Sequence, residues 1–142
     1  MNDLHNNART KSIIAPVAIG ANATKTGVVI DRQGYGGVEF IASYGAVTTT
    51  GTVVTLVVKE GDVTGTMTSV ADADLLGTEA LAGLAAGARV AGTGKEVTKR
   101  VGYKGNKRYV SVNSISTGTT SVGCIGIAAV LHSPQVAPTA NP

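Results

Sequence analysis

VGYKGNKRYVSV, residues 101–112, is the stretch of sequence that decides the fold. Two glycines flank Tyr103 and Lys104. Because glycine reaches backbone angles that a Cβ atom forbids, this segment predicts a tight turn. The residues that follow alternate in character, and Val110 and Val112 share one face. Such alternation predicts a half-buried β-strand that is entered through a positively charged turn.

The composition favours an all-β class with one hydrophobic core. A chain of 142 residues has the usual size of one domain and removes roughly two-thirds of its unfolded surface from water. Apolar residues make up 43% of the chain but aromatic residues only 4%, so the core must consist mainly of Val, Ile, Leu and Ala. The 19 glycines suit turns, and the frequent Thr and Val suit pleated strands.

About eight short strands are predicted, separated by turns rich in Gly and Thr. They cover residues 12–19, 27–31, 38–44, 52–60, 66–70, 95–101, 107–114 and 124–132. Segment 52–60 is apolar on both faces, which is typical of a central strand covered on each side or of a strand at a subunit interface. One open sheet cannot bury both of these faces. We therefore predict a two-sheet antiparallel sandwich, a jelly roll, with extended terminal arms.

The domain boundaries follow from composition at the two ends. Residues 1–11 are polar and show no strand or helix periodicity, so they predict an N-terminal arm. Residues 133–142 contain three of the four prolines and predict an extended C-terminal arm. The β-sandwich domain is expected to cover residues 12–132.

The region between the fifth and sixth predicted strands has a looser pattern. In residues 71–77, ADADLLG, one helical turn is predicted, with Gly77 as its left-handed stop. Thr78 is a candidate start for a second helix, but Gly83 and Gly87 interrupt it. We expect this region to be a long, partly irregular loop.

No motif in the sequence predicts catalysis, a metal site or a cofactor. His5 and His132 lie near opposite termini, and no pair of histidines has metal-ligand spacing. The single cysteine, Cys124, excludes an intramolecular disulfide and is expected to be a buried thiol in an apolar strand. Residues 92–96, GTGKE, lack the residues and the flanking elements of a phosphate-binding loop. We therefore expect a protein that is not an enzyme.

The N-terminus lacks the apolar stretch of a signal peptide, and no run of residues approaches the length of a membrane span. We expect synthesis in the cytoplasm without export, and no membrane among the partners.

Half of the twelve basic residues cluster within residues 95–108. They are Lys95, Lys99, Arg100, Lys104, Lys107 and Arg108. Two interpretations stay open: a solvated sheet edge, where lysines discourage pairing between edges, or a surface that binds a partner.

Tyrosines near the basic cluster favour a partner-binding surface. Lys, Arg and Tyr together suit either single-stranded nucleic acid or a protein interface. The net charge of +3 is too small to indicate nucleic acid by itself, so we favour protein and expect no nucleic acid partner. Tyr103 and Lys104 are expected at an exposed corner. The candidate protein-contact patch comprises Arg100, Tyr103, Lys104, Lys107, Arg108 and Tyr109.

Three segments resemble one family. They are DRQGYGGVEFIASYGAVTTTGT (31–52), SVADADLLGTEAL (69–81) and VGYKGNKRYVSV (101–112). Together they are similar to the jelly-roll cement, or capsid decoration, proteins of short-tailed bacteriophages. The resemblance covers roughly residues 27–132 and leaves both arms outside. Its most specific parts are the glycine-flanked QGY and the GYKGxKRYV block, and neither carries a catalytic residue.

The resemblance implies a structural virion protein. It implies a homodimeric subunit that sits on the outside of an HK97-like capsid and clamps neighbouring major capsid proteins. Two alternatives stay open. A carbohydrate-binding jelly-roll module displayed on the virion needs exposed aromatic residues, and the chain has no Trp. A head-completion or tail-joining protein would assemble as a ring.

Overall fold

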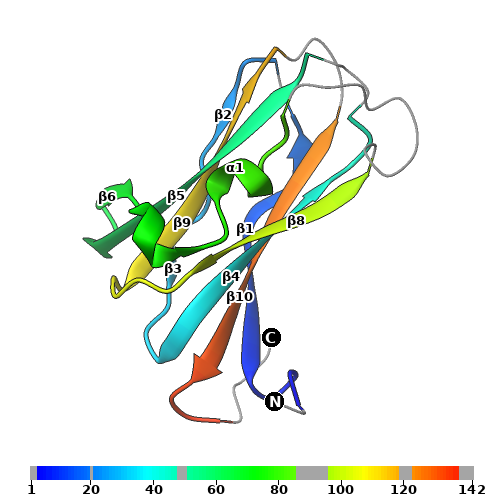
Figure 1. Ribbon diagram of the computed structural model, residues 1–142. Coiled ribbons are helices and arrows are strands. Elements are labelled where there is room, and N and C mark those ends of the chain that lie inside the picture. The colour runs from blue at the N-terminus through cyan, green and yellow to red at the C-terminus, as the bar shows by residue number, and fades with distance from the viewer. Residues whose placement is uncertain (1–2, 20, 48–50, 86–95, 119–122, 138–142) are drawn as a thin grey trace.

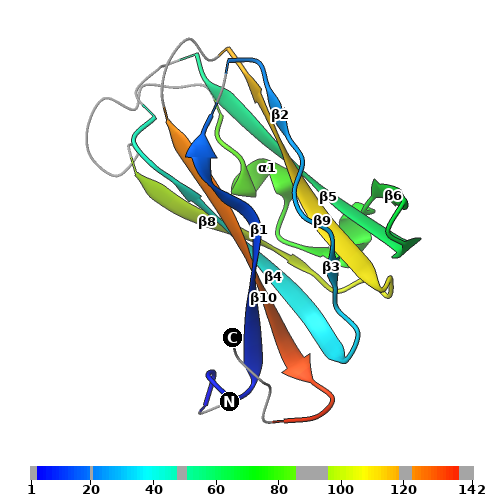
Figure 2. The ribbon, with the colours of Figure 1, turned by 180° about the vertical axis from the view of Figure 1, so that it is seen from behind.

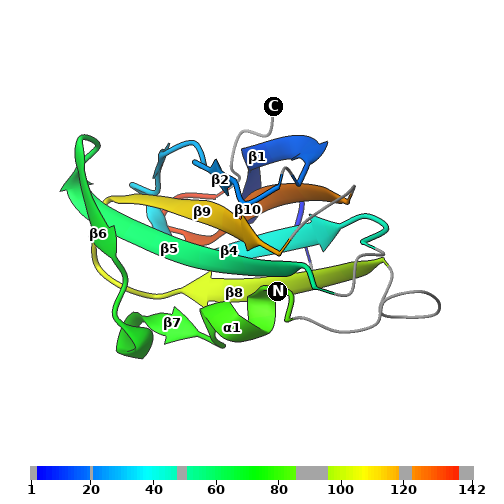
Figure 3. The same cartoon turned by 90° about the horizontal axis from the view of Figure 1, so that it is seen from above.

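The computed structural model shows two antiparallel β-sheets that pack face to face (Figure 1). It describes residues 3–19, 21–47, 51–85, 96–118 and 123–137. The view from above in Figure 3 separates the two layers. The predicted all-β, two-sheet sandwich is therefore confirmed.

The first sheet has five strands in the order β1-β10-β4-β8-β7. Their bounds are β1 (Ala8–Ala18), β10 (Cys124–Pro134), β4 (Tyr35–Tyr44), β8 (Val97–Tyr103) and β7 (Leu75–Leu76). Seen from behind in Figure 2, β1 crosses in front of β10 and β4. All of these neighbours pair antiparallel.

The second sheet has the order β2-β9-β5-β6, and β3 also pairs with β9. The strand bounds are β2 (Thr24–Lys25), β3 (Ile30–Asp31), β5 (Val53–Val63), β6 (Thr66–Ser69) and β9 (Tyr109–Thr117). Two short helices lie between β6 and β8, namely the 3-10 turn η1 (Asp72–Asp74) and α1 (Glu79–Ala82).

The strand order is that of a jelly roll. The described residues form ten strands, and eight remain when β3, which also pairs with β9, and the edge strand β7 are left out. Numbered in chain order, these eight have the sheet orders 1-8-3-6 and 2-7-4-5, which is the arrangement of two Greek keys. The prediction of about eight strands includes β3 within residues 27–31 and misses β2 and β7, which have two residues each.

The core lies between the inner faces of the two sheets. Val110 and Val112 of β9 are fully buried, as the alternation predicted. Phe40 of β4 is also buried, together with Val38 and Ala42 on the same face. Strand β5 is central in its sheet, because it pairs with both β9 and β6, but its outer face is not fully covered, since Thr55 is exposed.

A strap formed by residues 70–85 covers the open side of the sandwich between β5 and β8 (Figure 3). Gly77 has φ +83°, the left-handed conformation that was predicted, but the helical turn already ends at Asp74, and Gly77 follows β7 instead of stopping the helix. The Thr78 hydroxyl caps α1 by accepting from the backbone N–H of Leu81. At its end, Leu84 forms an isolated antiparallel bridge with Val54 of β5. The strap is thus an ordered part of the fold rather than the expected irregular loop; residues 86–95 lie outside the described residues.

The strap also supplies hydrogen bonds to the edge of β5. The Glu79 carboxylate accepts from the backbone N–H of Val58, and the backbone N–H of Val70 donates to the Val58 carbonyl. On its inner side the strap contributes Leu75 and Ala82 to the core. These contacts satisfy backbone groups that would otherwise be an unpaired strand edge.

Both expected arms are shorter than predicted. Strand β1 begins at Ala8, inside the stretch expected to be an arm, because Ala8 pairs with His132 and Lys11 with Ala129. Strand β10 continues to Pro134, which pairs with Tyr35. Pairing between residues far apart in the chain overrides the weak local pattern at both ends.

The expectation of a buried thiol at Cys124 is wrong, because the residue is exposed. Strand β10 alternates from Cys124 onward, and Ile125 takes the inward position with 1% exposure. The apolar neighbours of the cysteine fill the core, and the thiol lies on the outer face.

Replacing Tyr44 with Phe should lower the free energy of unfolding by about 1 to 3 kcal/mol, because a buried acceptor loses its donor. The Tyr44 hydroxyl donates to the Ala82 carbonyl at 2.7 Å, and both residues are buried. Urea denaturation measures the loss. The matched control is Tyr35→Phe, where we expect a change within about 0.5 kcal/mol. Equal losses in the two variants would contradict the assigned role of this bond.

Candidate protein-contact site

The predicted patch centres on the turn between β8 and β9, residues 104–108, at one end of the sandwich. This turn lies against a second turn, residues 32–34, and the Arg32 N–H donates to the Arg108 carbonyl at 3.0 Å. We call the two turns together the turn end. Gly105 is required there, because an added Cβ would lie 2.5 Å from the Tyr103 hydroxyl.

The second turn is formed by local hydrogen bonds. The Asp31 carboxylate accepts from the Gln33 N–H at 2.9 Å, as Asp commonly does in turns. The Tyr35 N–H then donates to the Arg32 carbonyl at 3.0 Å. Gly34 has φ +89°, a backbone conformation that L-residues with side chains rarely adopt. The glycine-flanked segment of the sequence therefore forms a tight connection between β3 and β4.

Tyr103 is fully buried, so the expectation that it lies at an exposed corner is wrong. It follows Val101 on the inner face of β8, where alternation places it in the core. Its hydroxyl donates to the Glu60 carboxylate of β5 and accepts from the Lys107 N–H at 3.0 Å. Burial, and then the bond to Glu60, raise the pKa of Tyr103 well above its usual range. Tyr103 therefore holds the turn from inside instead of contacting a partner.

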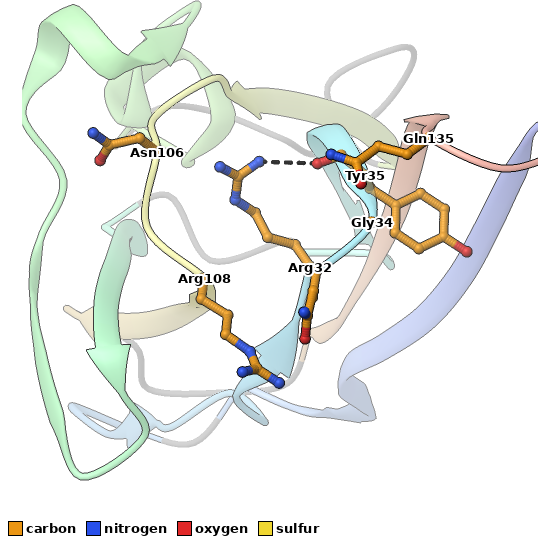
Figure 4. Close-up of a pocket in the computed structure, with 7 residues that line it drawn as sticks. Arg32, Gly34, Tyr35, Asn106, Arg108 and Gln135 are labelled. Atoms are coloured by element: carbon orange, nitrogen blue, oxygen red, sulfur yellow. Dashed lines mark hydrogen bonds between the residues drawn. The ribbon is translucent and has the colours of Figure 1, made fainter.

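Arg32 joins the two turns, and the sequence analysis did not identify it. Its guanidinium lies over the Tyr103 ring, 5.2 Å from the centroid, and donates to four backbone carbonyls. The acceptors are the carbonyl oxygens of Gly105, Lys107, Tyr35 and Gly36, at 2.5, 2.6, 3.2 and 3.4 Å. Figure 4 shows the side chain extending from its turn toward the 104–108 turn, with the bond to Tyr35 dashed. The carbonyls of Lys107 and Gly105 lie 75 and 73 residues from Arg32 in the chain, so nothing local in the sequence marks the contacts that join the two turns.

Two basic residues of the predicted patch form ion pairs at the turn end. The Lys107 ammonium lies 2.6 Å from the Asp62 carboxylate. The Arg108 guanidinium pairs with Asp31 through Nε and Nη2, with the shortest distance 2.6 Å. The hydrogen bond from Arg108 holds the pKa of Asp31 below its ordinary value of 3.8. Two of the six basic residues that cluster in the sequence are therefore ion-paired at the turn end.

Arg100 does not belong to the turn end. It lies within β8 opposite Ile41, on the outer face of the first sheet, and its side chain is 79% exposed. Its Nε is 3.6 Å from the Glu39 carboxylate. The structure thus separates Arg100 from the rest of the predicted patch.

The remaining predicted residues come together at the surface of the turn end. Lys104 is exposed, and within the part of the chain that the structure describes its ammonium has no ion pair. Tyr109 is half-buried, with the Arg108 guanidinium 5.1 Å from its ring centroid. The observed surface group therefore comprises Lys104, Lys107, Arg108 and Tyr109.

A concavity of about 250 Å³, which we call the turn-end pocket, opens beside these residues (Figure 4). It is lined by Arg32, Gln33, Gly34, Tyr35, Asn106, Arg108 and Gln135. The C-terminal segment closes one side, because the Gln135 N–H donates to the Gly34 carbonyl at 2.8 Å.

Among the described residues, no three His, Cys, Asp or Glu side chains gather as a metal site. No helix within the described ranges is both long and apolar enough to cross a membrane.

No family model and no curated protein matches this chain. Among solved structures, it is similar to the PBSX exported protein XepA, with 16% identity and a TM-score of 0.58. That alignment covers all of this chain but only 42% of XepA.

Two weaker similarities involve a phage capsid and a carbohydrate-active enzyme. The capsid structure of Helicobacter pylori bacteriophage KHP30 has 15% identity and a TM-score of 0.45, covering 92% of each chain. The Clostridium thermocellum xylanase 10B, with its CBM22-1 and GH10 modules, has 12% identity and a TM-score of 0.42. That match covers 96% of this chain and 28% of the xylanase chain. At 16% identity, what XepA shares with this chain is the fold alone.

Replacing Arg32 with Lys should lower the free energy of unfolding by about 2 to 4 kcal/mol, because an ammonium cannot reproduce the planar set of donors. Urea denaturation measures the change. The matched control is Arg100→Lys, an exposed arginine for which we expect a change within about 0.5 kcal/mol. A loss at Arg32 no larger than at Arg100 would show that the four carbonyl contacts do not stabilise the fold.

The Asp31–Arg108 pair predicts a pH dependence. Because folding lowers the pKa of Asp31, the pair contributes its stability fully above pH 3.8, and this contribution is lost as the pH falls through the lowered pKa. An NMR titration of the Asp31 carboxyl carbon should show a midpoint below 3.8. Arg108→Gln should move that midpoint up. An unchanged midpoint in the variant would contradict the assigned cause.

Proposed function

We propose that this chain is a structural virion protein that binds the outside of an HK97-like phage capsid and cements neighbouring major capsid proteins. The observation that carries the proposal is the jelly-roll strand order, found in a chain whose sequence resembles phage decoration proteins. The similarity to XepA agrees with the fold but extends no further. In this proposal the partners are the major capsid protein and a second copy of the chain, as a homodimer.

The turn end supports a role in protein contact. Its two turns are fixed to each other by Arg32 and to β5 by Tyr103, so the surface is preorganised for binding. Its ion pairs reduce the free positive charge, which disfavours binding to a nucleic acid backbone. A rigid surface with both charge signs suits recognition of another protein surface.

The remaining parts of the proposal follow from this role. A cement protein holds subunits together and needs no catalytic residues, so we propose that the chain is not an enzyme. It would be made in the host cytoplasm and would function in the virion, on the capsid surface. Each contact can be weak, because many copies on one shell give strong attachment through multivalency.

Decoration should raise the temperature at which expanded, DNA-filled capsids rupture. The physical reason is that a clamp across neighbouring subunits opposes their separation under internal pressure. Purified protein is added to undecorated capsids, and DNA release is followed by dye fluorescence during heating. Capsids without added protein give the reference temperature.

A charge-reversal variant tests whether the turn end makes the contact. Lys104→Glu changes an exposed residue outside the observed ion pairs and should reduce decoration without changing unfolding. Lys11→Glu, at an exposed position of β1 opposite Ala129, is the control. If wild-type protein leaves the rupture temperature unchanged, cementing is excluded. If Lys104→Glu decorates as well as the control, the turn end is not the contact surface.

A further inference from the structure

The turn-end pocket has a one-sided charge. Arg32 and Arg108 line it, and no Asp or Glu is among its lining residues. The other polar side chains are the amides of Gln33, Asn106 and Gln135, together with Tyr35. The pocket therefore combines two fixed cations with amide donors contributed by three separate segments of the chain.

Both arginines are held in place while some of their charge stays available. The four acceptors of Arg32 are neutral carbonyl oxygens, which orient the guanidinium without cancelling its charge. Arg108 uses Nε and Nη2 to bind Asp31, which leaves the two N–H groups of Nη1 outside that pair. Two guanidinium groups held in this way are preorganised for an anion.

The amides can complete such a site. Gln33, Asn106 and Gln135 are exposed at the rim, and each side chain carries two N–H donors. A carboxylate has acceptor positions for several donors at once and matches guanidinium geometry. A volume of about 250 Å³ is enough for one acidic side chain and too small for an extended nucleic acid strand.

We propose that the turn-end pocket binds a carboxylate side chain from an acidic segment of a partner protein. Charge complementarity selects this occupant, because Arg32 makes no ion pair among the described residues and Arg108 keeps its Nη1 outside its pair with Asp31. The choice of the major capsid protein as the source of that segment rests on the proposed function. Binding of an acidic segment to the pocket does not rest on the proposed function.

The probe for this site is a hexaglutamate peptide, blocked at both ends, with the hexaglutamine peptide as its matched neutral control. Titration of the ¹⁵N-labelled protein should shift the backbone amide signals of Gln33, Gly34, Asn106 and Gln135. Only the acidic peptide should do so, and its affinity should fall as salt is added, because salt screens an exposed charge contact.

A pair of substitutions tests the pocket directly. Asn106→Asp with Gln135→Glu adds two carboxylates to the rim and should weaken hexaglutamate binding at least about tenfold, through repulsion of like charges. Neither side chain forms a hydrogen bond with the described residues, so folding should be unaffected. The control, Thr55→Asp with Thr98→Glu, adds the same charge at exposed positions on the outer faces of the sheets. It should change the affinity by no more than about twofold, since distant exposed charges are screened.

Four outcomes would overturn the inference. They are no shift with either peptide, equal shifts with both peptides, an equal loss of affinity in the control variant, and binding of N-acetylneuraminic acid without binding of the peptide. The last result would assign the pocket to an acidic sugar. If the peptide fails but the protein still decorates capsids, the pocket inference falls and the proposed function stands. If the protein binds the peptide but does not decorate capsids, the pocket inference stands and the proposed function falls.

Discussion

The guanidinium of Arg32 is the contact on which the turn end depends. From the 32–34 turn it donates to the carbonyls of Gly105 and Lys107 in the 104–108 turn, 73 and 75 residues away, and it lies over the Tyr103 ring. Backbone carbonyls in tight turns lack partners within their own segment, so one side chain with a planar set of donors satisfies several of them. Tyr103 then links the same turn to Glu60 of β5. The end of the sandwich is thus fixed by polar contacts, while apolar packing fixes its middle.

This arrangement changes what the basic cluster means for function. In the sequence, the clustered Lys and Arg residues suggest a positive surface. In the fold, Lys107 pairs with Asp62 and Arg108 with Asp31, so these two cations hold the turns. What stays available is a small group of cations and amides around one pocket. A surface of this kind suits specific contact with a protein better than general attraction to a polyanion.

The fold class and the core strand were predictable because strand alternation is a local pattern, and Val110 and Val112 are buried as expected. The site was predictable only in part. Tyr103 is buried because β8 continues to this residue, beyond the predicted end at residue 101, and Cys124 is exposed because it takes the outward position beside the inward Ile125. Arg32 was missed since its partners become neighbours only after the jelly roll has formed. Sequence patterns identify elements, whereas contacts across half of the chain require the fold.

An image reconstruction of capsids mixed with the purified protein tests the central claim most directly. The account predicts density for the sandwich on the outer surface, bridging neighbouring major capsid proteins at repeated positions over the whole shell. The turn end should face the shell, with an acidic side chain of the capsid protein beside Arg108. Absence of such density, or a ring confined to a single vertex, would contradict the account, and the ring would indicate a head-completion protein instead.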